Sequence, residues 1–405
     1  MTPFSSFNFG TEFGLTPQEA LVKVASKKKK LYIGMPKEAS FQENRVALTP
    51  DAVTLLSNNG HRVVIETMAG ESASFTDHQY SEAGAEIAYE IETVFKATTL
   101  VKVAPFTDNE IQLLQPYQTI FSTIHLPTLK GDYVNALMRK KVTALAYEYI
   151  KDDAGNFPVV RSISEIAGGA AILIGAEYLS NRHNGQGLLL GGISGVPPAK
   201  VVILGAGVVG EFATRAALGL GAEVRVFDNN IYKLMRLQNN VNVRVYTSTI
   251  NTTLLNEELT KADLVVGAIH SESGRSPVIV TDAMVSNMKA GSVIIDVSID
   301  QGGCFETSEV TNHKKPVFTK YGVIHYCVPN IASRVSKTAS YALSQIIAPI
   351  LLEAYDHDGF DNLFHRSLGT RHGIYIYKGC LTNQHLSKRF NVKYTDLNLL
   401  FAASM

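Results

Sequence analysis

One stretch, VVILGAGVVGEFATRAALGLGAEVRVFD from Val201 to Asp228, constrains the fold of this chain more than any other. A short β-branched run comes first and has the length and composition of a buried strand. Glycines in the spacing G-x-G-x-x-G follow it, then a segment of helical character, a second apolar run and an acid. This order predicts a βαβ unit that binds a dinucleotide. A βαβ turn of purely structural character is the alternative.

Each glycine of the motif has a mechanical reason to be there. Gly205 permits the tight turn after the strand, Gly207 lets a pyrophosphate approach the backbone, and Gly210 lets the new helix pack close to the strand. The helix is predicted from Val208 to about Leu220, and its free N–H groups and positive dipole end face the phosphates. We therefore expect this turn to bind the cofactor.

Asp228 bears on the choice of cofactor. It lies 23 residues beyond Gly205, where a carboxylate accepts hydrogen bonds from both ribose hydroxyls of an adenosine. The same carboxylate would repel a 2′-phosphate. The next seven residues contain no arginine, although Lys233 is among them. The sequence therefore predicts a site for NAD rather than NADP.

The composition narrows the class of protein. A length of 405 residues leaves room for two or three domains, and 45% hydrophobic with 18% charged residues describe a globular protein with a sizeable core. A formal net charge of zero gives no electrostatic reason to expect a nucleic-acid or membrane-surface partner. We find no apolar stretch of membrane-spanning length and no signal-peptide pattern, and three scattered cysteines indicate neither a disulfide framework nor a metal cluster. We expect a cytoplasmic protein without a metal site.

Strand-like and helix-like segments alternate, which predicts an α/β fold of two doubly wound parallel sheets, each Rossmann-like, with a cleft between them. The predicted strands of the first sheet are Leu31–Met35, Val63–Glu66, Leu100–Val103, Thr119–Ile124 and Val142–Ala146. Those of the second sheet, beside 201–204 and 224–227, are Asn242–Val245, Leu264–Ala268, Val293–Val297 and Val323–Val328. Helix starts are marked by Thr49-Pro50 and by capping boxes at Thr107–Glu110 and Ser162–Glu165, the last of them opening a helix over about 163–181.

The order of these segments predicts the domains. Residues 1–30 form an N-terminal extension, in which Thr16–Glu19 is a further capping box. A long helical pattern from Ser336 to about Asp356 has the length to return the chain to the first domain. We therefore predict a discontinuous substrate and catalytic domain of residues 31–160 and 336–405, and an NAD-binding Rossmann domain of residues 161–335.

Side chains that could carry chemistry follow the predicted strands, where ligands bind in doubly wound sheets. Arg45 could hold a substrate carboxylate through two parallel hydrogen bonds, or be a surface arginine. His125 could act as an acid or base near neutral pH, or be a satisfied core histidine. Asp296 and Asp300 bracket the end of another strand, and one of them could accept a proton or orient water. For Asp296 we prefer a loop-capping role.

Four segments carry a resemblance to a known family. They read GLLLGGISGVPPAKVVILGAGVVG, VFDNNIYKL, IDQGGCFE and YCVPNIASRVSKTASYAL. With them the chain resembles the alanine dehydrogenases, within the wider group shared with the N-terminal part of the nicotinamide nucleotide transhydrogenase α subunit. The segment IGMPKEASFQENRVALTP is similar to the start of both branches. The resemblance runs from about Leu31 to the region of Asn383.

The resemblance implies two doubly wound domains, usually in a homohexamer, and reversible NAD-dependent deamination of L-alanine to pyruvate and ammonia. It implies that Arg45 binds the substrate carboxylate, that His125 is the acid/base group and that Asp300 helps to activate water and passes protons. Asn330 is implied to lie near the nicotinamide. The other implied cofactor contacts are Ser164, the glycine turn, Asp228 and Lys233.

One departure from the family pattern bears on activity. The family usually has Val-Lys-Val-Lys-Glu-Pro after the third strand, and its second lysine contacts the substrate, whereas this chain has Ala104 at that place. Lys102 lies two residues earlier and could share the cleft side, so it is a substrate-binding candidate. The alternatives to an alanine dehydrogenase are a dehydrogenase for another amino acid, a catalytically weakened NAD-binding paralogue and a soluble transhydrogenase subunit.

Overall fold

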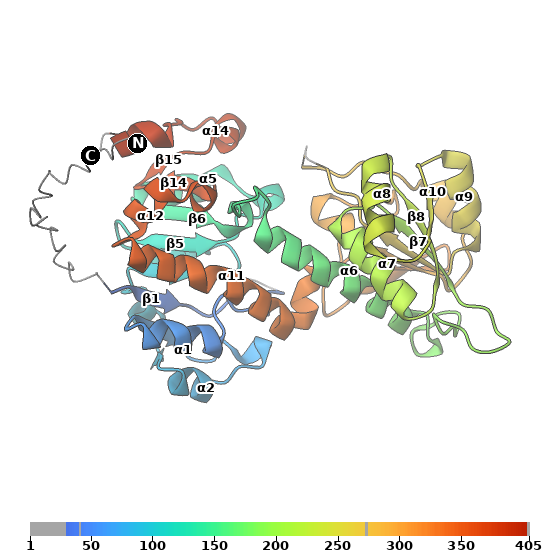
Figure 1. Cartoon of the computed structure of the whole chain (residues 1–405), viewed down its shortest axis with the longest axis horizontal. Coiled ribbons are helices and arrows are strands. Elements are labelled where there is room, and N and C mark those ends of the chain that lie inside the picture. The colour runs from blue at the N-terminus through green and yellow to red at the C-terminus, as the bar shows by residue number, and fades with distance from the viewer. Residues whose placement is uncertain (1–29, 40–41, 272–273, 403–405) are drawn as a thin grey trace, which may run out of the picture.

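The computed structural model describes residues 30–39, 42–271 and 274–402, and Figure 1 shows them as two lobes that are each built on one β-sheet. The strands of the first sheet are β1 (Tyr32–Met35), β2 (Arg62–Glu66), β3 (Glu86–Ala88), β4 (Thr99–Val101), β5 (Thr119–Ser122), β6 (Thr143–Ala146), β14 (Ile374–Tyr377) and β15 (Cys380–Leu381). Those of the second sheet are β7 (Lys200–Leu204), β8 (Glu223–Phe227), β9 (Tyr246–Ser248), β10 (Leu264–Gly267), β11 (Val293–Asp296), β12 (Val317–Lys320) and β13 (Val323–Tyr326).

The strand orders are those of doubly wound α/β sheets. The first sheet runs β15-β14-β6-β5-β4-β1-β2-β3 and the second runs β12-β13-β11-β10-β7-β8-β9. All neighbours pair in parallel except at one edge of each sheet, where β14, β15 and β12 pair antiparallel. The α/β prediction is confirmed, but both sheets are mixed rather than purely parallel. Because β14 and β15 come from the C-terminal part of the chain, the first sheet is assembled from two distant stretches, while the predicted domain limits stay a prediction.

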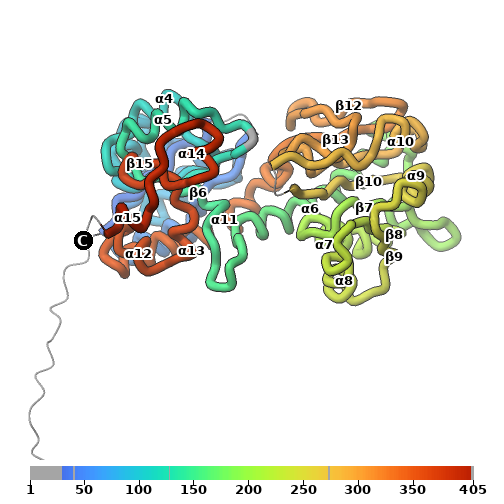
Figure 2. The backbone as a smooth tube through the Cα atoms, turned by 90° about the horizontal axis from the view of Figure 1, so that it is seen from above, coloured from blue at the N-terminus to red at the C-terminus, as the bar shows by residue number. Residues whose placement is uncertain are grey.

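Helices cover both sheets. They are α1 (Pro50–Asn58), α2 (Asp77–Glu82), α3 (Ile91–Val94), α4 (Asp108–Leu113), α5 (Gly131–Arg139), α6 (Pro158–Tyr178), α7 (Val208–Gly219), α8 (Ile231–Asn240), α9 (Thr252–Lys261), α10 (Asp282–Ser286), α11 (Ser336–Asp356), α12 (Phe360–Arg366), α13 (Leu368–Arg371), α14 (Gln384–Phe390) and α15 (Leu397–Ala402). Figure 2 shows the C-terminal elements α12 to α15 on the first lobe, with α6 and α11 between the lobes.

The sheets are buried on both faces because successive strand residues are apolar. In β7, Val201 and Ile203 pack into one core cluster while Val202 and Leu204 pack into another on the opposite face. In the first sheet, Ile33 of β1 packs into one core cluster, while Val64 of β2 and Leu100 of β4 pack into another. Strands of this kind read as continuous apolar runs, which is why the sequence identifies them.

Two of the predicted helix starts are correct. Thr49 is the N-cap of α1, with Pro50 at its first position, and Thr107 and Glu110 form the predicted capping box of α4. The prediction at Ser162 is wrong, because α6 begins at Pro158. The Ser162 hydroxyl donates instead to the Val159 carbonyl within the helix. The capping box at Thr16–Glu19 lies outside the described residues.

The strand predicted at Asn242–Val245 is also wrong, because the strand there is β9, Tyr246–Ser248. Asn242 has a φ of 56°, in the left-handed region, which an extended strand does not tolerate. The long helix predicted from Ser336 to Asp356 is confirmed as α11.

Helix α6 leads from the first lobe to the second and packs tightly on α7. At Gly168, an added Cβ would lie 2.3 Å from the Val209 carbonyl oxygen and 2.8 Å from the Ala213 nitrogen. At Gly175, it would lie 2.5 Å from a methyl group of Leu264 in β10. By length and composition α6 could cross a membrane, but here several of its apolar residues, among them Ala171, Ile172 and Ile174, form part of a core cluster. Small residues let this helix approach the Rossmann unit closely.

The neighbouring glycines 168 and 169 provide a matched test of this packing. We expect Gly168→Ala to destabilise the protein by roughly 1–3 kcal/mol, because its methyl group meets backbone atoms that cannot move aside. Gly169 has no atom within 4 Å of an added Cβ, so Gly169→Ala should stabilise α6 by about 1 kcal/mol through helix propensity. Thermal unfolding of both variants measures the difference. Equal unfolding temperatures would contradict the close packing of α6 on α7.

Candidate active site

The predicted site residues follow the carboxyl ends of strands in both sheets, where ligands bind in folds of this class. In the first sheet, Arg45 comes after β1, Lys102 after β4 and His125 after β5. In the second sheet the order is the glycine turn after β7, Asp228 after β8, Asp300 after β11 and Asn330 after β13.

Arg45 forms a buried ion pair with Glu43. Nε of Arg45 donates to Oε1 of Glu43 at 2.7 Å, Nη2 donates to Oε2 at 2.6 Å, and both residues are buried. Burial opposes charge on both groups, but their attraction outweighs it, so the pKa of Glu43 lies below its ordinary value and the pKa of Arg45 above. Arg45 is therefore a fixed cation and not a surface arginine.

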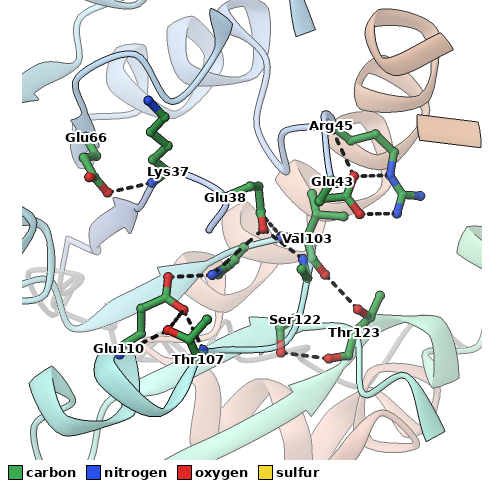
Figure 3. A network of polar contacts seen from close by, with 12 residues as sticks. Lys37, Glu38, Glu43, Arg45, Glu66, Val103, Thr107, Glu110, Ser122 and Thr123 are labelled. Atoms are coloured by element: carbon green, nitrogen blue, oxygen red, sulfur yellow. Dashed lines mark hydrogen bonds and ion pairs between the residues drawn. The ribbon is translucent and has the colours of Figure 1, made fainter. Parts of the chain in front are cut away.

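The pairing leaves part of the guanidinium free. Nη1 of Arg45 makes no hydrogen bond to any residue that the structure describes, and Figure 3 shows it turned away from Glu43. A small pocket lies beside the pair, lined among others by Lys37, Glu38 and Met68. A planar guanidinium with free donors beside a pocket can hold a carboxylate.

The loop that carries Arg45 also contacts the second lobe. Nδ2 of Asn330 donates to Oε2 of Glu43 at 2.9 Å, and the Asn44 N–H donates to Oγ of Ser333 at 2.9 Å. Asn330 precedes the 3₁₀ helix η6 (Ile331–Val335) and has a φ of 58°, in the left-handed region. The residue predicted near the nicotinamide is thus tied to the partner of Arg45.

His125 and Asp300 share the electrostatic environment of Arg45. Partial desolvation by the surrounding protein lowers the pKa of His125, and the Arg45 cation lowers it further, while Asp300 acts in the opposite direction. Burial raises the pKa of Asp300, against the effects of the Asn330 N–H, His125 and Arg45. Both side chains remain reachable from solvent, so His125 is not a core histidine. The neutral imidazole is therefore favoured near neutral pH.

Asp296 has the loop-capping role that we preferred for it. It is buried and caps the 3₁₀ helix η5 (Val297–Gln301), which carries Asp300. Its carboxylate accepts from the Ser298 N–H at 3.0 Å, the Cys304 N–H at 3.0 Å and the Ser308 hydroxyl at 2.6 Å. All of these bonds hold the loop in place, so Asp296 acts on the site only through Asp300.

Lys102 is enclosed by protein in this structure. Its side chain is 0% exposed, and Nζ lies 2.5 Å from Oε1 of Glu110 and 4.0 Å from Oε2 of Glu38. Figure 3 shows Glu110 bound in turn by Thr107 in the capping box of α4. The ammonium is therefore committed to protein carboxylates here, and its role in substrate binding stays a prediction.

Glu38 holds the segment in which the family lysine is missing. Its carboxylate accepts from the Val103 N–H at 2.6 Å and from the Ala104 N–H at 3.2 Å. Burial raises its pKa to about 8, against the effects of Lys102 and of both backbone N–H groups. Neither Glu38 nor Glu43 was predicted as a site residue, although both stand in the same loop as Arg45. No spacing rule separates such carboxylates from solvated ones.

The glycine turn has the geometry that a dinucleotide needs. Gly205 has a φ of 106°, and a Cβ there would lie 2.4 Å from the Ala268 carbonyl oxygen. A Cβ at Gly210 would lie 1.9 Å from the Gly205 carbonyl oxygen, which explains the close packing of α7. A Cβ at Gly207 would meet nothing within 4 Å, so its backbone faces open space. Together with the N-terminus of α7 at Val208, this turn fits a pyrophosphate.

Asp228 lies beside this turn and is buried. Its carboxylate accepts from the Ala206 N–H and the Asn230 N–H, each at 2.7 Å, which leaves lone pairs for ribose hydroxyls. The arginine of α8 nearest the turn, Arg236, donates to the Ala206 carbonyl at 3.3 Å and lies 4.0 Å from Glu211. Its charge is thus partly balanced by protein.

The two remaining candidates lie on helices next to the turn. Ser164 is one helical turn before Gly168 in α6, on the side that meets the start of α7. Lys233 lies in the first turn of α8, where its N–H donates to Oδ1 of Asn230 at 3.1 Å. Among the residues that the structure describes, no group of three or more His, Cys, Asp or Glu side chains could hold a metal ion.

Comparisons with known proteins cover most of the chain. Residues 34–167 and 171–384 match the families described as alanine dehydrogenase/PNT N-terminal domain and C-terminal domain. The chain is 37% identical over 366 residues to the alanine dehydrogenase of Staphylococcus epidermidis and to alanine dehydrogenase 2 of Staphylococcus aureus, covering 90% of this chain and 98% of each relative.

Solved structures agree with these matches. An L-alanine dehydrogenase superposes with a TM-score of 0.84 at 36% identity, covering 89% of this chain and 99% of that one. A transhydrogenase from Sinorhizobium meliloti superposes with a TM-score of 0.74 at 22% identity, covering 87% of this chain and 99% of that one, which shows a shared fold.

The raised pKa of Glu38 predicts a pH dependence of stability. Between the ordinary pKa of a glutamate and a value of about 8, the folded protein keeps a proton that the unfolded chain has lost. The bound proton therefore adds to the free energy of unfolding in acid, and this contribution is lost as the pH rises through that range. We expect Glu38→Gln to weaken the fall in unfolding temperature between about pH 5 and pH 8. Glu92→Gln, at an exposed glutamate of α3, is the control. Parallel curves for Glu38→Gln and the native protein would contradict a proton held on Glu38.

Proposed function

The chain belongs to the alanine dehydrogenase/PNT family, and we propose that it is an NAD-dependent oxidoreductase that converts L-alanine reversibly to pyruvate and ammonia. The observation that supports this proposal is that Arg45, His125 and Asp300 follow strands of both sheets and act on one another's charge. Arg45 and His125 come from the first sheet and Asp300 from the second. The glycine turn and Asp228 supply a dinucleotide site in the same molecule.

In this reaction the protein would bind the substrate carboxylate, exchange protons with the substrate nitrogen and orient a water molecule. NAD, when bound, supplies the acceptor for the hydride that leaves Cα of the amino acid. Arg45 would hold the substrate carboxylate through Nη1, the nitrogen that Glu43 leaves free. Near neutral pH the unprotonated His125 can take the proton that the substrate ammonium loses as its C–N bond gains double-bond character. Asp300 would orient the water that adds to the resulting imine, and His125 would return a proton to the departing ammonia.

The cofactor side is assigned by the same reasoning. Asp228 would accept the ribose hydroxyls, and the turn at Gly207 and Val208 would receive the pyrophosphate. Ser164 and Lys233 would contact the cofactor from α6 and α8, and Asn330 would lie beside the nicotinamide. Binding of NAD rather than NADP is supported by the carboxylate of Asp228.

A second candidate function is slow turnover, or turnover of another amino acid. Ala104 replaces the family lysine, and Lys102 is bound to Glu110. The transhydrogenase alternative is supported only by a shared fold. We further propose a cytoplasmic homo-oligomer, a hexamer by family resemblance, with the domain limits predicted from the sequence.

The direct test is production of NADH by the purified protein from L-alanine, compared with a panel of other amino acids. We expect His125→Ala and Asp300→Asn each to lower kcat by roughly 10²-fold, the scale of general acid–base groups. NAD affinity should change less, because neither residue lies at the glycine turn. His78→Ala, at an exposed histidine of α2, is the control that should keep full activity. Full activity of His125→Ala would return that residue to a structural role, and better turnover of another amino acid would replace alanine as the substrate.

Cofactor choice is tested at Asp228. We expect the native protein to use NAD in preference to NADP, and Asp228→Ala to narrow the gap, because the substitution removes the negative charge that faces a 2′-phosphate. Removing an acceptor of the Ala206 N–H should also weaken NAD binding. Steady-state kinetics with both cofactors measure the two effects. Equal use of NAD and NADP by the native protein would contradict the assignment.

A further inference from the structure

Glu148 lies next to His125 because of the strand order. β5 and β6 are parallel neighbours, with Ser122 opposite Ala146. His125 follows the end of β5 and Glu148 follows the end of β6, in the 3₁₀ helix η3 (Tyr147–Tyr149). Two loops that leave adjacent parallel strands at the same edge must pass side by side. Nothing in the reaction described above uses Glu148.

The Glu148 carboxylate is bound to the backbone that carries His125. Its Oε1 accepts from the Ile124 N–H at 2.6 Å, and the His125 N–H also stabilises the charged carboxylate. His125 itself has φ 48° and ψ 61°, in the left-handed region. A residue with a Cβ enters that region only where its surroundings impose it. Glu148 supplies an acceptor at the point where this turn begins.

Other buried groups surround Glu148 on its far side. Oε2 is buried and has no hydrogen-bond partner among the described residues. The hydroxyl of Tyr375 on β14 is also buried, and the charge of Glu148 contributes to the raised pKa of Tyr375. Burial raises the pKa of Glu148 to about 7, against the Ile124 and His125 N–H groups. The carboxylate therefore has little freedom to move away from the turn.

We propose that Glu148 is a positioning residue for His125, and that its carboxylate holds the backbone of residues 124–125 in the left-handed turn that directs the imidazole toward Arg45 and Asp300. The expected effect on catalysis rests on the proposed function. The expected effect on the orientation of the His125 ring does not. Reach matters more than charge in this role, because a neutral amide oxygen can also accept a hydrogen bond from a backbone N–H.

Two conservative variants separate reach from charge. Glu148→Asp keeps the charge but draws the carboxylate back by one C–C bond, about 1.5 Å, so that it no longer reaches the Ile124 N–H. Glu148→Gln loses the charge but keeps an oxygen in place to accept that bond. Asp263→Asn is the matched control, because Asp263 is also a buried carboxylate that accepts a backbone N–H, that of Lys200 at 2.8 Å. It lies at the N-terminal ends of β7 and β10, at the edge of the sheet opposite the candidate site.

The first readout is the pKa of His125, followed by NMR of its ring and assigned with His125→Ala. In the native protein this pKa is lowered by burial and by Arg45, against Asp300 and Glu43. We expect Glu148→Asp to raise it toward the ordinary value of histidine, as the ring leaves that environment. Glu148→Gln and Asp263→Asn should leave it unchanged. This measurement needs neither substrate nor turnover.

The second readout is the kinetics with L-alanine. We expect Glu148→Asp to lower kcat by roughly 10-fold to 10²-fold, the scale of a misplaced catalytic group, with the KM for NAD unchanged. Glu148→Gln should keep most of the activity. An unchanged pKa of His125 in Glu148→Asp would overturn the proposal, and so would a larger change in Glu148→Gln than in Glu148→Asp. If the native protein does not oxidise L-alanine, the proposed function fails while the NMR result still decides the role of Glu148.

Discussion

Arg45 and Glu43 form an ion pair away from water, at the point where loops from both sheets meet. Removing one member of a buried pair leaves the other charge without compensation and typically costs roughly 3–5 kcal/mol. The pair therefore holds its own loop in place, and through Asn330 it also holds the loop from the second lobe. Its cation lowers the pKa of His125 and favours the ionised form of Asp300. The contact between the lobes and the charge state of the two candidate proton-transfer groups thus depend on one guanidinium.

Protein groups surround the segment in which the family lysine is missing. Glu38 binds the N–H groups of Val103 and Ala104, and Lys102 is enclosed between Glu38 and Glu110. Because the ammonium of Lys102 is paired with Glu110 and its side chain is buried, it offers no accessible positive charge beside Arg45 in this structure.

Several non-glycine residues of the described chain have a left-handed backbone conformation, and two of them belong to the candidate site. His125 and Asn330 both adopt the left-handed conformation although neither is glycine, and Glu148 and Glu43 are the carboxylates that bind next to them. Strained backbone persists only where surrounding contacts impose it. The C-terminal strand β14 contributes through Tyr375, which lies behind Glu148. The last part of the chain thus takes part in the architecture of a site whose reacting groups are encoded far earlier.

The sequence by itself determined the elements whose signal is local. Apolar runs predicted the central strands because both faces of each sheet are buried, and the glycine spacing predicted the βαβ turn because Gly205 and Gly210 leave no room for a Cβ. The capping box at Thr107 could be predicted because its hydrogen bonds join residues that are close in the sequence. The start of α6 and the position of β9 were misjudged, because Ser162 and Asn242 have more than one local use and packing selects among them.

Only the tertiary structure decided which side chains meet. The family resemblance assigned Arg45, His125 and Asp300 to one site, but their shared electrostatic environment follows from the approach of two sheets, which no local pattern encodes. The burial of Lys102 depends in the same way on Glu38 from another loop. Glu148 was not singled out at all, because its partner is a backbone N–H on the neighbouring strand's loop. A hydrogen bond between distant segments leaves no period or spacing in the chain, so it becomes visible only when the strands are in register.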